Sequence, residues 1–263
     1  PGVTTTVLGL AACWPADREA LVVDADCAGG DLVVRFTGGE DGLRSSPSTV
    51  QLAAAARSGM TSDALFEALQ SLPGPGEVRA LVGPSASSAA STALESLLRC
   101  GLVDLLAGLR RFDTLVDVGR LDPWSPAMGL VRELGSVVVV VSATFASVVH
   151  ARDLIAALRP MGVRCVLLVH GAGPYAPAEI AETLGGLPVV GVVPHDERGA
   201  RALAGEATNP KTLARSRLLR ACAETAEVLT RPAPADDASP QSRREVPSEI
   251  PEPDRYASTG RQR

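Results

Sequence analysis

The sequence contains a single lysine, Lys211, and nearly all of its positive charge is carried by arginine. This scarcity excludes a lysine side chain from any site built by the residues ahead of it. Aromatic residues make up only 3% of the chain, although hydrophobic residues make up 46%. A sizeable core can therefore form, but it must consist mainly of Ala, Val and Leu.

Several classes of protein are excluded by other absences. The five cysteines are isolated and show no CxxC or Cys/His spacing, so we expect reduced, mostly buried thiols in a cytoplasmic protein, with neither a disulfide framework nor a zinc site. No apolar run approaches the roughly 20 residues that a membrane span needs. A dinucleotide-binding oxidoreductase is a weak alternative, because no GxGxxG motif opens a strand–helix turn in the chain. The chain has no signal peptide and no initiator Met, so we expect it either to start inside a longer polypeptide or to have been trimmed.

Short apolar runs alternate with amphipathic stretches, which is typical of βαβ units and a mainly parallel sheet. Strands are predicted at Leu21–Asp24, Val78–Val82, Thr114–Asp117, Ser136–Val141, Val163–Val169 and Val189–Val193. Helices are predicted at Thr4–Cys13, Thr49–Arg57, Ser62–Gln70, Ser87–Leu109, Ser125–Leu134, Ala146–Leu158, Pro177–Leu184, Asp196–Ala204 and Leu213–Leu229. We expect a three-layer α/β domain over residues 1–230 and a disordered tail, rich in proline and charge, over residues 231–263.

The N-terminus has the pattern of a phosphate-binding loop. Gly2 would let backbone N–H groups approach a phosphate, and Thr4 or Thr5 would offer a hydroxyl to Mg²⁺ at the start of an apolar helix. Val3, however, stands where such a loop carries lysine. The alternative interpretation is a glycine turn and a threonine-rich cap that open an ordinary helix.

Carboxylates end two of the predicted strands. Asp24 and Asp26 follow one strand and Asp117 ends another, so all three would lie at the carboxyl edge of the sheet, where open α/β folds bind ligands. The alternative is that they are solubilising or capping residues at strand ends.

Four segments together resemble the MinD/ParA family of deviant Walker ATPases, over most of residues 1–230. They are Gly2–Thr6 with its apolar helix, Val22–Gly30, Phe112–Asp117 and Val189–Asp196. The resemblance implies a P-loop NTPase-like fold whose first strand lies upstream of Pro1, and ATP with Mg²⁺ as cofactors.

The family's roles carry over onto the matching positions. The resemblance implies that Gly2, Val3, Thr4 and Thr5 line the phosphates and that Thr4 also ligates Mg²⁺. Asp24 and Asp117 would hold Mg²⁺ through its waters, and Asp26 would position the attacking water. Pro194 and Asp196 would flank the base, and His170 stands where the family often has an adenine-reading asparagine.

The resemblance implies a factor that positions or partitions other cellular parts in cell division, chromosome segregation or placement of a surface apparatus. It would act as a homodimer with an unidentified protein partner, with ATP hydrolysis weakened or lost because of Val3. The alternative is a scaffold that binds protein partners without nucleotide. A third interpretation is an active ATPase that takes its charge from an upstream lysine, Arg18 or Arg35.

Positive charge on the last predicted helix leaves a further possibility. Lys211, Arg215, Arg217 and Arg220 form either a solvated face or a patch for non-specific DNA. A net charge of −5 argues against a general polyanion-binding surface.

Overall fold

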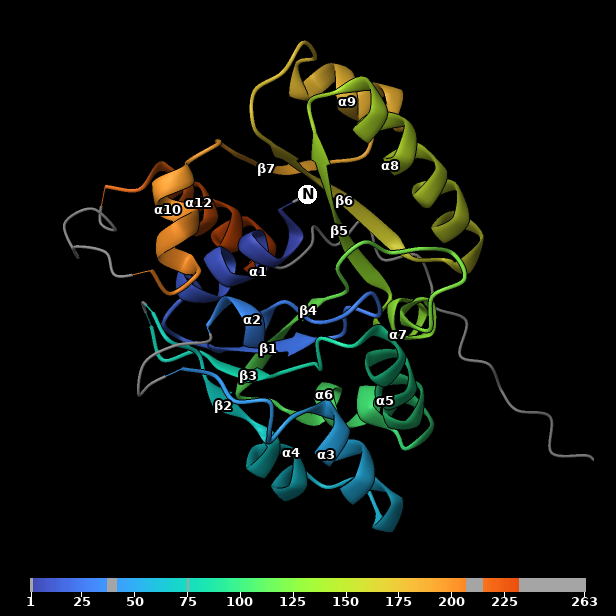
Figure 1. Cartoon of the computed structure of the whole chain (residues 1–263). Coiled ribbons are helices and arrows are strands. Elements are labelled where there is room, and N and C mark those ends of the chain that lie inside the picture. Colours follow the sequence, from blue (N-terminus) through green and yellow to red (C-terminus); the bar gives the residue numbers. More distant parts are fainter. Residues whose placement is uncertain (1, 37–41, 75, 207–214, 232–263) are drawn as a thin grey trace, which may run out of the picture. The chain divides into compact units, whose positions relative to one another are not determined.

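The computed structural model describes residues 2–36, 42–74, 76–206 and 215–231. Within them the strands form two sheets, with orders β2-β3-β1-β4 and β5-β6-β7 (Figure 1). The strands are β1 (Glu19–Asp24), β2 (Gln70–Ser71), β3 (Arg79–Leu81), β4 (Phe112–Asp117), β5 (Ser136–Ser142), β6 (Arg164–His170) and β7 (Val189–Val193). All pairs are parallel except β2 with β3. The predicted α/β class is confirmed, and each predicted strand is present within two residues of its expected bounds.

The α-helices of the described residues are α1 (Val3–Ala12), α2 (Leu32–Arg35), α3 (Thr49–Ala55), α4 (Ser62–Ala68), α5 (Ser87–Arg99), α6 (Leu102–Gly108), α7 (Ala127–Leu134), α8 (Phe145–Leu158), α9 (Pro177–Thr183), α10 (Glu197–Leu203) and α12 (Arg217–Thr230). The single helix predicted over Ser87–Leu109 is wrong. Gly101 adopts a φ of 88° between α5 and α6, a left-handed conformation that ends one helix and starts another. The short strand β2 and the short helix α2 were not predicted.

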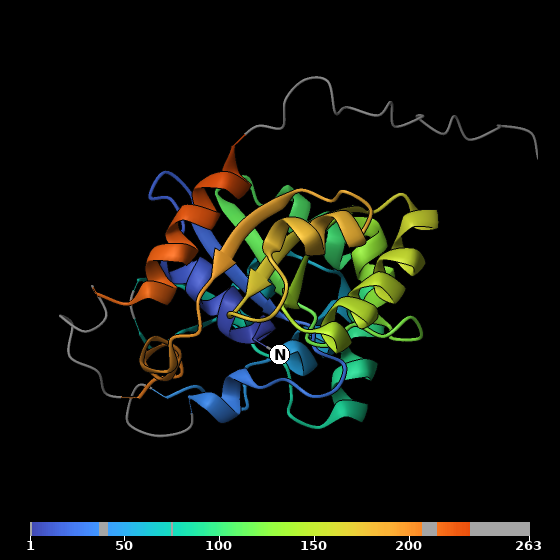
Figure 2. The same cartoon turned by 90° about the horizontal axis from the view of Figure 1, so that it is seen from above.

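The alternation of side chains along the strands divides the core into layers. On β1, Ala20 and Val22 face a cluster with α1, α10 and α12, while Leu21 and Val23 face a cluster with α3 to α6. A third cluster covers the other face of β5 and β6 with α8 and α9. Figures 1 and 2 show the strands between these helices, which is the predicted three-layer arrangement.

The two sheets share one core, but within the described residues no ladder pairs them. The first cluster contains Val22 of β1 and Leu168 of β6, so α1 and α12 cover both sheets. Each of β4 and β5 has a strand neighbour on one side only among the described residues. Both of these edges carry apolar side chains such as Leu115 and Val140, which remain only partly buried.

Of the predicted tail, only Arg231 lies within the described residues, and the domain boundary stays a prediction. Lys211 also lies outside them. All five cysteines are free, but only Cys165 and Cys222 are buried, so the expectation of mostly buried thiols is wrong for the other three. Within the described part of the chain, no helix is both long and apolar enough to cross a membrane.

Candidate functional site

The N-terminal turn has the backbone geometry of an anion site. Gly2 adopts φ 93° and ψ 3°, a left-handed conformation that favours glycine. The amide of Thr6 donates to the carbonyl of Gly2 at 2.9 Å. The preceding N–H groups, those of Val3, Thr4 and Thr5, have no acceptor within α1. Such groups and the helix dipole attract negative charge.

Thr4 connects this turn to the carboxyl ends of two strands. Its side chain lies close enough to the carboxylate of Asp117, the last residue of β4, to lower the pKa of that carboxyl. Asp117 is paired in register with Asp24, the last residue of β1. Thr4 is 9% exposed, Asp24 3% and Asp117 2%. The structure therefore brings three of the predicted site residues together in a buried cluster at one edge of the sheet.

The Asp24 carboxylate is only half satisfied. Its Oδ1 accepts a hydrogen bond from the Asp26 amide at 3.3 Å, but its buried Oδ2 has no hydrogen-bond partner. Burial, followed by the charge of Asp117, raises the pKa of Asp24 to about 7. A buried carboxylate oxygen without a donor is costly, and a cation would satisfy it.

Three glycines let the backbone approach these carboxylates closely. A Cβ on Gly30 would overlap Asp24 Oδ2, and a Cβ on Gly83 would stand 3.1 Å from the Asp24 carboxyl carbon. A Cβ on Gly119 would overlap the carboxylate of Asp26. The sequence pattern indicates only a plain turn at Gly119 and does not single out Gly83, although each closely follows a strand.

Asp26 and Asp117 are also shifted toward the protonated form. Burial raises the pKa of Asp26, although the amide of Ala28 donates to its Oδ1 at 2.8 Å and opposes the shift. Burial likewise raises the pKa of Asp117, while the Thr4 side chain, the bond from the Gly119 amide, at 2.9 Å, and the charge of Arg35 lower it. Burial is the first cause of both shifts, so a cation beside these carboxylates would favour their charged form.

The residues present fit Mg²⁺ only as a hydrated ion. The described residues contain no group of three or more His, Cys, Asp or Glu side chains placed to hold a metal. Two buried carboxylates and the Thr4 hydroxyl are nevertheless what Mg²⁺ uses when it keeps several waters and takes further oxygens from a phosphate. The orphaned Asp24 Oδ2 is the atom that such an ion would satisfy.

Arg18 does not supply charge to this crevice. Its Nε lies 2.7 Å from Asp113 Oδ2 and its Nη2 donates to the Phe112 carbonyl at 3.2 Å. Phe112 and Asp113 begin β4, whereas Asp117 ends it. Arg18 therefore lies at the opposite end of that strand, and its proposed role in the site is wrong.

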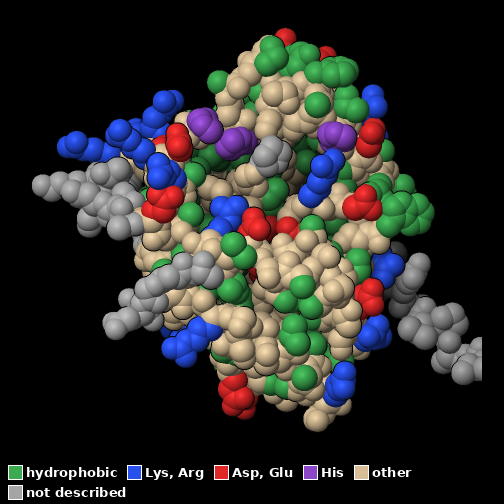
Figure 3. Space-filling view, in the orientation of Figure 1, with side chains coloured by type: hydrophobic (Ala, Val, Ile, Leu, Met, Phe, Trp, Pro, Cys, Tyr) green, Lys and Arg blue, Asp and Glu red, His purple; other side chains and the backbone are tan. Residues whose placement is uncertain are grey.

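Two histidines lie beside the N-terminal turn. His170 ends β6, and a Cβ on Gly2 would stand 3.6 Å from its Cδ2. The His170 ring meets that of His195 edge to face, with centroids 6.3 Å apart. Burial and the neighbouring His195 lower the pKa of His170. Pro194 and His195 follow β7 directly, so the two histidines lie at the ends of β6 and β7, beside Gly2. Figure 3 shows two neighbouring histidine side chains on this face of the molecule. The pairing was not predicted from the sequence.

Asp196 is engaged in capping two helices. Its Oδ1 accepts from the Gly199 amide at 2.9 Å at the start of α10. Its Oδ2 accepts from the Ser216 hydroxyl at 2.8 Å and from the Arg217 amide at 3.0 Å at the start of α12. These hydrogen bonds lower the pKa of Asp196 against the opposing effect of burial. The carboxylate therefore already has a structural role beside the predicted base site.

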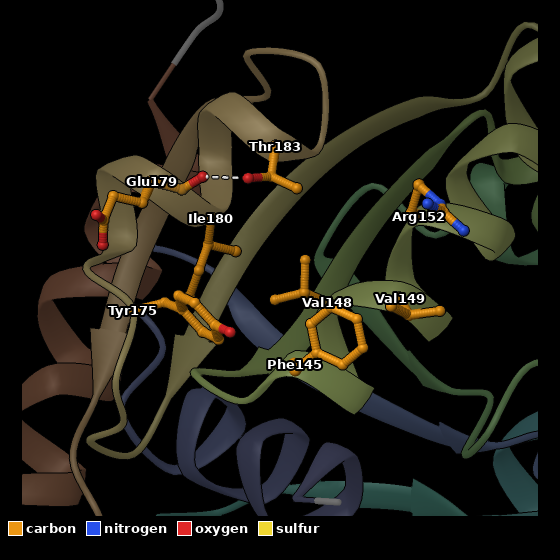
Figure 4. Close-up of a pocket in the computed structure, with 8 residues that line it drawn as sticks. All are labelled: Phe145, Val148, Val149, Arg152, Tyr175, Glu179, Ile180 and Thr183. Carbon is orange, nitrogen blue, oxygen red and sulfur yellow. Dashed lines mark hydrogen bonds between the residues drawn. The ribbon is translucent and has the colours of Figure 1, made fainter.

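A separate groove of about 290 Å³ lies between α8 and α9. Figure 4 shows side chains of α8 facing those of α9 and the loop ahead of it across the groove. Phe145 is 71% exposed and Tyr175 38%. The groove is lined by Phe145, Val148, Val149, Arg152, Tyr175, Glu179, Ile180 and Thr183.

No protein-family model matches the sequence, and no curated protein matches it either. Solved structures do match. MinD of Pyrococcus horikoshii complexed with Mg-ADP is 17% identical with a TM-score of 0.65, over 88% of this chain and 91% of that one. A ParA family ATPase of Chlorobium tepidum is 15% identical with a TM-score of 0.65, over 86% and 92%. A variant of Cyanothece McdA in complex with ATP is 16% identical with a TM-score of 0.58, over 88% and 93%. The chain therefore has the fold of the MinD and ParA ATPases.

Proposed function

We propose that this protein is a MinD/ParA-like nucleotide-binding factor that positions or partitions other cellular parts. The strongest support is that Thr4, Asp24 and Asp117 lie close together at the N-terminal end of α1. This arrangement places an anion site beside a cation site. The fold shared with MinD, ParA and McdA supports the same proposal. The proposed location is the cytoplasm.

In this proposal ATP places its phosphates against the N–H groups that follow Gly2. Mg²⁺, when bound, would neutralise charge on the phosphates, with Thr4, Asp24 and Asp117 holding it or its waters. Asp26 is only partly buried, so its carboxylate can accept a hydrogen bond from a water beside the phosphates. Val3 contributes no charge, and the absence of one charge-assisted hydrogen bond costs roughly 1.5–3 kcal/mol. Binding survives such a loss better than hydrolysis does.

The test is calorimetric titration with Mg-ATP. We expect micromolar binding that Thr4→Ala weakens at least tenfold, because it removes a hydroxyl from both the helix turn and Asp117. We expect phosphate release to be slow, and Asp26→Ala to abolish what remains. The alternative is a scaffold that binds protein partners without nucleotide. An unmeasurable heat with Mg-ATP would contradict the nucleotide-dependent function and favour that alternative.

We further propose that a strand ahead of Pro1 pairs with β4 and β5. Both edges are apolar, whereas natural sheet edges are usually guarded by charge, proline or a covering segment. The loop after β4 also packs, through Val118 and Leu121, in the core cluster that contains Val141 of β5. Hydrogen exchange at β4 and β5 amides should slow markedly when the natural upstream residues are present; unchanged exchange contradicts the proposed strand.

We propose that the protein forms a homodimer and that one of its surfaces binds DNA. Figure 3 shows a group of arginine side chains on the flank formed by α10 and α12. Exposed arginines on or next to these neighbouring helices are Arg198, Arg201, Arg215, Arg217 and Arg220. They form the proposed DNA-binding surface.

The homodimer is tested by analytical ultracentrifugation. We expect dimerisation that depends on Mg-ATP, and a monomer at all nucleotide concentrations would contradict the proposal.

A further inference from the structure

Arg35 is the basic side chain that the fold places against the N-terminal turn. Its Nη1 lies 3.5 Å from the hydroxyl of Thr5, in the first turn of α1. Arg35 therefore lies beside the helix turn of the proposed site.

The guanidinium is incompletely satisfied where it lies. Its Nη2 pairs with Asp31 Oδ2 at 3.3 Å, but that carboxylate is 58% exposed and the pair lies within one helical turn. Its Nε is buried and has no hydrogen-bond partner. A buried guanidinium N–H without an acceptor costs free energy, and an anion beside Thr5 would provide that acceptor.

The backbone that carries Arg35 is held by the core. Arg35 ends the short helix α2, and the residues at either end of that helix, Leu32 and Phe36, are 1% and 4% exposed. The Phe36 ring packs directly against Gly205, where a Cβ would stand 2.7 Å from Cδ1. The position of Arg35 is thus set by packing of its neighbours, and its own side chain, 30% exposed, remains accessible to a ligand.

Acidic side chains line the crevice. Asp24 and Asp117 are paired in register at the ends of β1 and β4, and Asp26 follows β1 by two residues. A triphosphate would add further negative charge to this cluster. Val3 provides none in compensation, and Arg18 is paired with Asp113 at the other end of β4.

We propose that Arg35 replaces the missing lysine of the phosphate loop and binds the phosphate oxygens of the nucleotide directly, beside the N–H groups of α1. This inference deepens the proposed function and rests on it. A guanidinium suits the role because it can donate two parallel hydrogen bonds to one phosphate. On binding, the contact between Arg35 and Asp31 is exchanged for contacts to the ligand.

The test uses two probes, Mg-ATP and inorganic tripolyphosphate with Mg²⁺, titrated calorimetrically into the wild type and three Arg35 variants. Arg35→Ala and Arg35→Gln remove the charge, and we expect each to weaken both probes roughly ten- to a hundred-fold. Arg35→Lys retains the charge and should recover part of that loss. The difference between wild type and Arg35→Gln should shrink at high salt, because the contact is partly exposed.

Matched controls separate this contact from general charge. Arg120 is exposed and follows Gly119 near the crevice, while Arg99 lies on α5 with its side chain 70% exposed. Arg120→Gln and Arg99→Gln should bind both probes as the wild type does. Thermal unfolding of each variant shows whether it is folded, and the comparison of Arg35→Lys with Arg35→Gln holds side-chain bulk nearly constant if Arg35→Ala unfolds.

The outcomes distinguish the two proposals. Mg-ATP binding that is equal in the wild type and Arg35→Gln overturns the role of Arg35 and leaves the proposed function standing. Tripolyphosphate binding that depends on Arg35, without any binding of Mg-ATP, supports the anion site and overturns the nucleotide function. A wild type that binds neither probe overturns both, and a loss in Arg120→Gln but not in Arg35→Gln assigns the role to the other arginine.

Discussion

Gly119 adopts a φ of 58° directly against the carboxylate of Asp26, so that a Cβ at this position would overlap the carboxylate oxygens. The amide of Gly119 also donates to Asp117 at 2.9 Å. One glycine therefore fixes the relative positions of two acidic side chains that follow different strands. Its lack of a side chain is required both by its backbone conformation and by the space that Asp26 occupies.

We predict that Gly119→Ala displaces Asp26 and destabilises the protein by more than the strain of a positive φ alone, which is about 1 kcal/mol. Gly135→Ala is the matched control, because Gly135 has a φ of 69° with nothing within 4 Å of the added Cβ. Urea unfolding measures both free energies. Equal losses in the two variants would show that the contact with Asp26 carries no cost.

The strands and their edge could be predicted from the sequence because they depend on local pattern. Runs such as Val137–Val141 are apolar throughout, and strands covered on both faces have this composition. The acidic residues at the ends of β1 and β4 could be placed at one edge because parallel strands align their carboxyl ends. That reasoning required only the order of the elements along the chain.

Other features depend on contacts between distant residues and carry no local signal. Examples are the approach of Thr4 to Asp117, the position of Arg35 beside Thr5 and the ring pair of His170 with His195. They arise because α1 packs beside the strand ends. Helix α2 has only four residues, too few for a periodic pattern. The break at Gly101 was missed because an isolated glycine is tolerated within a helix.

The stability of the magnesium-free, nucleotide-free protein should fall as the pH rises from about 4 to about 7. The pKa of Asp24 is raised from 3.8 to about 7, so between these values the folded state holds a proton that the unfolded state has released. By linkage, the contribution of this group is fully present below the unfolded pKa and is lost as the pH rises through the folded pKa, on the order of 4 kcal/mol in total. Asp26 and Asp117 shift in the same direction.

Asp24→Asn removes this titration while keeping the size of the side chain. We therefore expect the variant to be more stable than the wild type at pH 8 and to show a flatter dependence on pH in thermal unfolding with EDTA present. Mg²⁺ should stabilise the wild type at pH 8 more than the variant. A wild type whose stability is independent of pH over this range would contradict the assignment.

Asp196 should matter more to stability than an ordinary helix cap, because one carboxylate serves both α10 and α12. Asp196→Ala is expected to cost more than the 0.5–2 kcal/mol typical of a single cap, roughly 2–4 kcal/mol. Thr61→Ala is the control, since the Thr61 hydroxyl accepts only one cap bond, from Ala64 at 3.2 Å. The measurement is urea unfolding at pH 7, and a loss no larger than that of Thr61→Ala would contradict the double cap.

The same carboxylate gives a second, pH-dependent readout. The pKa of Asp196 is lowered, so its contribution to stability is present above the ordinary carboxyl pKa and is lost as the pH falls through the lowered value. Asp196→Asn should therefore lose less stability than the wild type on acidification below about pH 4. Parallel acid unfolding curves for the two proteins would show that the capping bonds do not depend on the charge.

The arginines on the flank of α10 and α12 should bind double-stranded DNA without sequence preference. The variant Arg198→Ala, Arg215→Ala, Arg220→Ala removes three exposed charges on or next to these neighbouring helices. Removing an arginine that neutralises one phosphate should lower the slope of log affinity against log salt by about 1. We therefore expect weaker binding and a shallower salt dependence in fluorescence anisotropy with a random duplex.

The matched control for this DNA surface replaces Arg99, Arg132 and Arg152, whose side chains are 70%, 59% and 62% exposed on other helices. It should bind the duplex as the wild type does, since its charges lie away from α10 and α12. Because both triple variants change the net charge equally, an equal loss of affinity in the control would assign the effect to overall charge and not to this flank.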